Sequence, residues 1–112
     1  MIELVIKKFL DSHLTVPAFL EKPSNSPARY VLFEKTGGGK REHICSSTFA
    51  FQSYAKTMYE AVEINEEIKQ VVEEMIILDS IAKVSLNSDY NFTGTTSKKY
   101  RYQAVFDIVH YE

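Results

Sequence analysis

The stretch VSLNSDYNF (residues 84–92) decides the fold class, because its apolar and polar residues alternate almost without interruption. A period of two residues is typical of a strand that buries one face and exposes the other to water. The segment YRYQAVFDI (residues 100–108) continues this period, so the two segments predict a hairpin around a flexible loop at 93–99. The side chains expected to point into the core are Val84, Leu86, Tyr90, Phe92, Tyr100, Tyr102, Ala104, Phe106 and Ile108.

A helical pattern precedes this hairpin. Apolar residues recur every three or four positions from Tyr54 to Met75, interrupted only at Asn65, and Ser53 is of a residue type that caps helix N-termini. Asn65 is followed by two glutamates and also fits the start of a second helix, so one helix and two helices both stay open. The segment 54–79 contains seven acidic residues and two lysines, which predicts an acidic outer face. Such a face is either solvated or a contact between subunits.

The first half of the chain predicts a short helix followed by strands. Apolar residues at helical spacing define the helix, and alternating residues of β-rich composition define the strands. Three consecutive glycines, 37–39, predict a flexible hairpin arm, since glycine loses more conformational freedom than any other residue when it is ordered. The predicted segments are a helix at 2–10, strands at 16–20, 29–35 and 42–52, and flexible loops near 22–28 and 36–41.

Together these segments give the order α-β-β-β-α-β-β, which predicts an α+β fold. We expect a mainly antiparallel sheet of four to five strands, packed against one long helix and a short N-terminal helix. A chain of 112 residues with 45% hydrophobic and 25% charged residues fits a single domain over 1–112. The net charge of -2 excludes the global basic field that is typical of nucleic-acid binders.

No residue pattern for catalysis or cofactor binding occurs in the sequence. The fragment KTGGGKR (residues 35–41) lacks the Ser or Thr that follows the lysine of a phosphate-binding P-loop, and it leads into a predicted strand. The three histidines lack the spacing of metal ligands. The single cysteine, Cys45, falls on the same face of its predicted strand as Phe49 and Phe51, so it is expected to be a small core residue. We therefore predict a protein that is not an enzyme and binds no metal, nucleotide or redox cofactor.

Two pairs of segments together resemble a known family. They are VLFEKTGGG (31–39) with SSTFAFQSYA (46–55), and DYNFT (89–93) with YRYQAVFD (100–107). In order and size, nearly the whole chain is similar to the tail-completion, or tail-terminator, proteins of long-tailed bacteriophages and of prophages in Gram-positive hosts. The resemblance implies a small structural α+β subunit that closes into a hexameric ring, ends the tail tube and joins it to the head connector.

The same resemblance implies partners and a location. The partners are other copies of the chain, which is a hexamer in the particle although free subunits can be monomers, the tail-tube protein, and the head-completion or connector protein. DNA passes through the ring without specific binding, no membrane is involved, and the protein moves from the host cytoplasm during assembly to the virion tail or neck. The expected contact residues are Lys35, Thr36, Gly37, Gly38, Gly39, Lys40, Arg41, Thr93, Gly94, Lys98 and Lys99. The basic residues near the glycines are expected to meet acidic groups of a neighbouring subunit, and the acidic helix is one candidate.

Two alternatives stay open. Head-closure and minor capsid proteins of the phage neck are candidates within the same class of structural proteins. From another class, a small nucleic-acid or peptide-binding α+β module is suggested by Lys98, Lys99 and Arg101, which lie among aromatic residues. Salt-dependent binding of nucleic acid would favour that module, whereas ring formation without nucleic-acid affinity would favour the phage protein.

Overall fold

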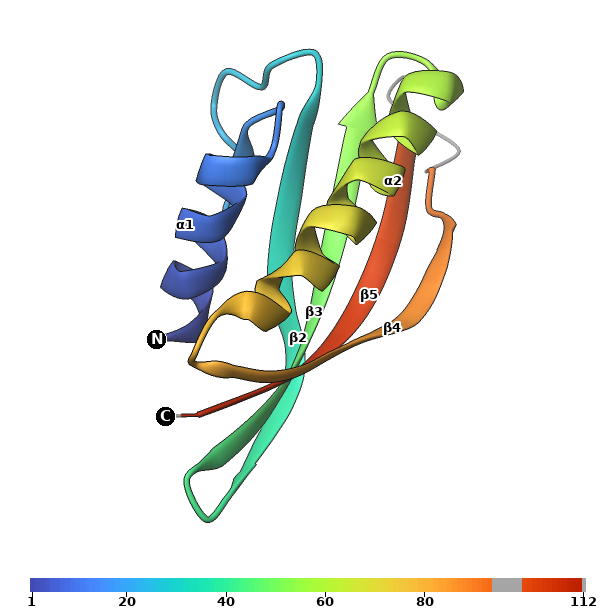
Figure 1. Ribbon diagram of the computed structural model, residues 1–112. Helices are drawn as coiled ribbons and strands as arrows, with labels where there is room; N and C mark the ends of the chain where they lie inside the picture. Colours follow the sequence, from blue (N-terminus) through green and yellow to red (C-terminus); the bar gives the residue numbers. More distant parts are fainter. Residues whose placement is uncertain (94–99, 112) are drawn as a thin grey trace.

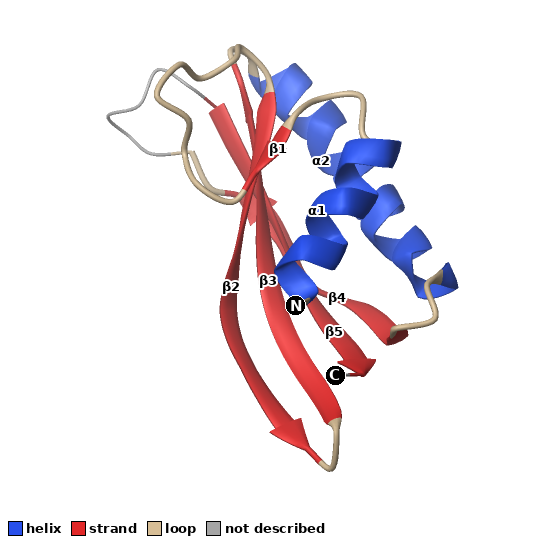
Figure 2. Cartoon of the chain, turned by 90° about the vertical axis from the view of Figure 1, so that its left-hand side faces the viewer, coloured by secondary structure: helices blue, strands red, loops and turns tan. Residues whose placement is uncertain are grey.

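A five-stranded sheet covered on one face by two helices forms the structure, a computed structural model that describes residues 1–93 and 100–111 (Figures 1 and 2). The strand order is β1-β2-β3-β5-β4, and all neighbours are antiparallel except β1 and β2. The elements are α1 (Ile2–His13), β1 (Ala18–Phe19), β2 (Tyr30–Arg41), β3 (Ile44–Ala55), α2 (Met58–Glu74), the 3-10 helix η1 (Met75–Ile77), β4 (Ile81–Asn91) and β5 (Tyr100–Tyr111).

The α+β class and the predicted sheet are confirmed, whereas the finer order is matched only in part. The structure inserts η1 between α2 and β4, and β1 has only two residues and pairs in parallel. The predicted contrast in helix length is small, since α2 has 17 residues and α1 has 12. The predicted loop at 22–28 contains no helix or strand.

The start of α2 differs from the prediction. Ser53 lies in β3, where it pairs with β2 on one side and β5 on the other, so the ladder holds it in extended backbone. The N-cap is Thr57, whose hydroxyl oxygen accepts the backbone N–H of Glu60 at 3.2 Å. Thr57 and Glu60 have the three-residue spacing of a capping box. The helix then continues through Asn65, which is 1% exposed, so the alternative of two helices is not observed.

The glycine-rich segment is a paired strand in the structure, and this corrects the predicted loop at 36–41. It extends β2, with Gly37 opposite Thr48 and Arg41 opposite Ile44, after a bulge that follows Lys35. The turn lies at 42–43, where both residues have positive φ, 50° and 70°. Two such residues form the tight turn that matches the twist of a hairpin. We call residues 36–46 the arm; the arm extends beyond the sheet body at the lower end of Figure 1, and its side chains are exposed except the half-buried Cys45.

The three glycines of the arm are not equivalent, and this gives a first test of the ladder. A Cβ atom on Gly38 would lie 2.8 Å from the backbone oxygen of Ser46 and 2.9 Å from Cε of Lys35, whereas a Cβ atom on Gly39 meets nothing within 4 Å. We expect Gly38→Ala to destabilise the arm by about 1–3 kcal/mol through overpacking. Gly39→Ala should be neutral or stabilise by up to about 1 kcal/mol, because it restricts the unfolded chain.

Hydrogen exchange of the arm amides measures this difference. Protection should fall in Gly38→Ala and persist in the matched Gly39→Ala variant. Equal protection in both variants would contradict the register of β2 against β3.

The core lies between the sheet and the two helices. Phenylalanines of β2, β3 and β5 pack against aliphatic residues of α1 and α2, and the largest fully buried members are Phe33, Phe49, Phe51, Phe106, Ile6, Leu10, Ile64, Ile68 and Ile108. Burying these side chains is the main stabilising contribution of the fold. Of the aromatic residues predicted as core in the last hairpin, Phe106 is buried and Tyr102 packs partly against the cluster.

Val84 packs partly against the core as predicted, but the other residues of 84–92 that were expected in the core are exposed, and the prediction was wrong there. Leu86, Tyr90 and Phe92 are 44%, 41% and 40% exposed, and Tyr100 of β5 is also exposed. For Tyr90 and Phe92 the cause is a register shift between Leu86 and Ser88, which moves the later side chains of this segment to the opposite face of the sheet. Leu86, before the shift, lies opposite the buried Phe106 on the helix side, whereas Tyr90, after the shift, lies opposite Gln103 on the other side.

Candidate functional site

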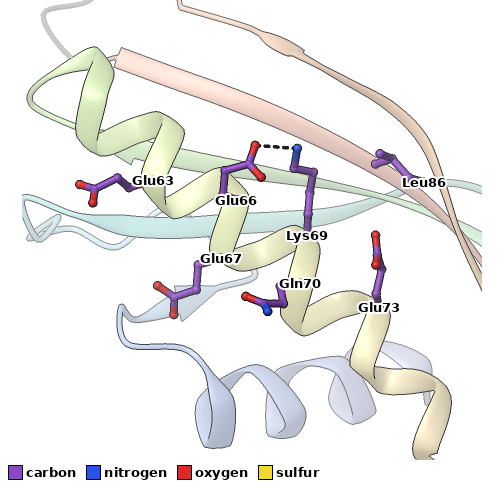
Figure 3. Close-up of a pocket in the computed structure, with 7 residues that line it drawn as sticks. All are labelled: Glu63, Glu66, Glu67, Lys69, Gln70, Glu73 and Leu86. Atoms are coloured by element: carbon purple, nitrogen blue, oxygen red, sulfur yellow. Dashed lines mark ion pairs between the residues drawn. The ribbon is translucent and has the colours of Figure 1, made fainter.

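A groove between α2 and the edge strand β4 is lined by more charged side chains than the other concave surfaces of the described residues (Figure 3). Its volume is about 640 Å³, and glutamates of α2 form most of its lining. The lining residues are Glu63, Glu66, Glu67, Lys69, Gln70, Glu73 and Leu86, and we call this surface the acidic groove. Leu86 contributes an apolar patch to the β4 side. The predicted acidic helix face is thus one wall of a groove.

Hydrogen bonds and ion pairs fix the two walls of the groove to each other. The Lys69 ammonium donates to Asp89 of β4 at 2.6 Å and to Glu66 at 2.8 Å. These bonds, with Asp89 contributing most, raise the pKa of Lys69 above its ordinary value. The buried Asn65 amide donates to the other Asp89 oxygen at 2.7 Å. The interruption of the apolar stripe at Asn65 therefore marks the position where α2 is attached to β4.

The glutamates of the groove differ in how far their charge is neutralised. Glu66 is paired with Lys69, and Glu67 accepts the backbone N–H and the hydroxyl of Thr15, each at 2.7 Å. Glu63 and Glu73 form no ion pair within the described part of the chain, and both are exposed. Their carboxylates give the groove a net negative charge that is open to a positively charged partner.

The predicted contact residues do not form one surface. Lys35, Thr36, the three glycines, Lys40 and Arg41 all lie on or beside the arm. Thr93 lies at the opposite end of the sheet, where its hydroxyl oxygen accepts the backbone N–H of Arg101 at 3.0 Å. Gly94, Lys98 and Lys99 lie outside the described residues.

The sheet face opposite the helices carries a second cluster, of which the sequence indicated only Arg101 and its aromatic neighbours. It consists of Gln52, Tyr54, Tyr90, Phe92, Arg101 and Gln103, connected by hydrogen bonds and ring contacts. The Arg101 guanidinium donates to the Tyr54 hydroxyl and to the Phe92 carbonyl, both at 2.9 Å, and its carbon lies 4.2 Å from the Phe92 ring centroid. The guanidinium and the aromatic ring that a nucleic-acid binder would offer are therefore engaged with each other.

The residues considered for chemistry are dispersed. His110 contacts the Ser47 hydroxyl at 2.8 Å, His13 stacks on Phe9, and His43 lies at the tip of the arm. Cys45 is half-buried and lines an apolar cavity of about 380 Å³. It is not the core residue expected from the strand face that it shares with Phe49 and Phe51. Across residues 1–93 and 100–111, no three His, Cys, Asp or Glu side chains come together as a metal site. No helix in those ranges is long and apolar enough to cross a membrane.

On the sheet face opposite the helices, the Asp107 carboxylate of β5 connects its strand to β3 and β4. It accepts the Asn87 amide at 2.9 Å and the Thr48 hydroxyl at 2.7 Å. These hydrogen bonds, the one from Asn87 first, lower the pKa of Asp107. The carboxylate therefore serves to hold β3, β5 and β4 in register.

Comparison of the chain with protein-family models and with curated proteins found no match.

Proposed function

We propose that the chain is a structural protein of a bacteriophage or prophage, the tail-terminator subunit that forms a hexameric ring on the tail tube. The observation that carries this proposal is the exposed arm, whose β2 half has no strand on its outer side and carries Lys40 and Arg41, in a chain whose opposite sheet edge carries an acidic groove. A subunit with two different complementary surfaces associates head to tail. Such contacts close into a ring when the rotation between neighbours permits it.

The charge of the subunit suits a ring through which DNA passes. The net charge is -2, and the acidic residues of α2 add a local negative surface. Binding to DNA is driven largely by Lys and Arg contacts with phosphate, so such a subunit has little general affinity for a passing duplex. The partners in this proposal are further copies, the tail-tube protein and the head connector, first in the host cytoplasm and then in the virion neck.

Sedimentation velocity with and without the tail-tube protein of the same genome tests the proposal. We expect a sixfold species or a complex with tube ends, and no binding to single- or double-stranded DNA. Free subunits are allowed to be monomeric, because ordering residues at an interface costs about 1–2 kcal/mol each. Binding to the connector alone would favour a head-closure protein, and salt-dependent DNA binding without rings would favour the nucleic-acid module.

A further inference from the structure

We infer that the arm of one copy docks into the acidic groove of the next copy. This inference rests on the proposed function, because it identifies the contact through which the ring closes. It assigns the groove a single occupant, a second copy of this chain. Three features of the molecule support this contact: the charges of the two surfaces, their unpaired strand edges, and the positions of both within one chain.

The charges of the two surfaces are complementary. Lys40 and Arg41 give the arm two exposed positive side chains against one acidic residue, Glu42 at the turn, and the exposed Lys35 directly precedes the arm. The groove offers four glutamates against the single Lys69, which is already held by Asp89 and Glu66. Complementary charges at a docking surface increase the association rate and determine which surfaces pair.

Each surface also includes a sheet edge and an exposed apolar residue. β1 pairs with β2 only at Val31 and Leu32, so in the described chain no strand covers the outer edge of β2 along the arm. β4 is the other edge strand of the sheet. Unpaired strand edges are surfaces on which another chain adds. Ile44 of the arm and Leu86 of the groove are both about half exposed, and an arm seated along β4 would cover both side chains.

The arm cannot reach the groove of its own chain. It continues β2 and β3, whereas β5 lies between β3 and the groove strand β4. To fold back, the arm would have to break the pairing of its β3 half with β5, from Ile44–Tyr111 to Ser46–Val109. The occupant of the groove is therefore another copy, and each copy supplies one arm and one groove, as a head-to-tail ring requires.

Paired charge reversals test the contact. The arm variant is Lys40→Glu with Arg41→Glu, and the groove variant is Glu63→Lys with Glu73→Lys, which leaves the Lys69 ion pairs intact. The matched controls reverse the exposed pairs Lys8 with Lys22 and Glu21 with Asp79, which lie outside both surfaces. All variants should melt within a few degrees of wild type, because surface substitutions change stability by about 0.5 kcal/mol or less.

The measurement is ring formation by sedimentation velocity in the presence of tail-tube protein. The arm variant and the groove variant should each need at least about tenfold more protein than wild type to form rings, whereas the controls should match wild type. An equimolar mixture of the two variants should regain rings, because acidic arms then meet basic grooves and basic arms meet acidic grooves in alternation.

The outcomes separate this inference from the proposed function. Wild-type rings together with undiminished rings in either variant would overturn the arm–groove contact and leave the terminator proposal standing. Two inactive variants whose mixture stays inactive would also overturn it, since the two surfaces would then not be partners. A wild-type protein that neither forms rings nor binds tubes would instead overturn the proposed function.

Discussion

Phe51→Ala is expected to lower the free energy of unfolding by about 3–5 kcal/mol, the largest effect of any substitution considered. Phe51 is fully buried in β3, and its ring packs against Phe33 at 5.8 Å and against Phe106 at 6.0 Å between centroids. Truncation leaves a cavity at the point where three strands and the helices meet, and the surrounding rings cannot fill it. Urea denaturation followed by circular dichroism measures the loss.

The matched control is Phe92→Ala, the same truncation at a position that sequence periodicity placed in the core. Phe92 is 40% exposed, and its main partner is the Arg101 guanidinium. We expect a loss of about 1 kcal/mol or less, which is the range of an exposed cation–π contact. Losses of similar size in the two variants would contradict the register shift that places Phe92 on the sheet face away from the core.

The second large effect is expected from Asp89→Ala, which should destabilise the protein by about 1–3 kcal/mol. Asp89 accepts the buried Asn65 amide and the Lys69 ammonium, so its removal leaves a buried donor without its partner and a lysine without its main ion pair. The same urea experiment measures the change. Because both walls of the acidic groove depend on this carboxylate, ring formation should weaken as well.

Asp79→Ala is the control for that substitution. Asp79 is exposed and lies just before β4, outside the network around Lys69. Its replacement should change stability by about 0.5 kcal/mol or less. If Asp89→Ala were as mild as this control, the attachment of α2 to β4 would be refuted.

Periodicity predicted the elements of this fold better than it predicted which faces are buried. The alternation in 84–92 correctly indicated a strand, because the period of two persists on either side of the bulge. The bulge itself has no residue signature there, and one extra residue moves every later side chain to the other face. The error at Tyr90 and Phe92 therefore arose from one unpaired residue.

The arm shows a second limit of local reasoning. Glycine favours turns, so three glycines indicated the turn, although the turn lies at Glu42 and His43. Of the three glycines, only Gly38 is required by a close contact, since the backbone of Ser46 and the side chain of Lys35 leave no room for a Cβ atom there. Such a close approach is visible only once the partner strand is in place.

The acidic groove was predictable only in its parts. The excess of acidic residues in α2 and the polar interruption at Asn65 are both evident in the sequence. The groove itself depends on Leu86, which lies on the helix side by ordinary alternation, and on Asp89, which reaches that side only through the shifted register of β4. Charge composition therefore indicated a surface, and strand register determined its shape and its second wall.

Electron microscopy of tail-tube ends after incubation with this protein tests the central claim most directly. The account predicts that the tube ends carry a closed ring of six copies, in which the arm of each copy lies against α2 and β4 of the next. Bare tube ends that continue to grow at saturating protein would contradict the claim that the protein terminates the tube.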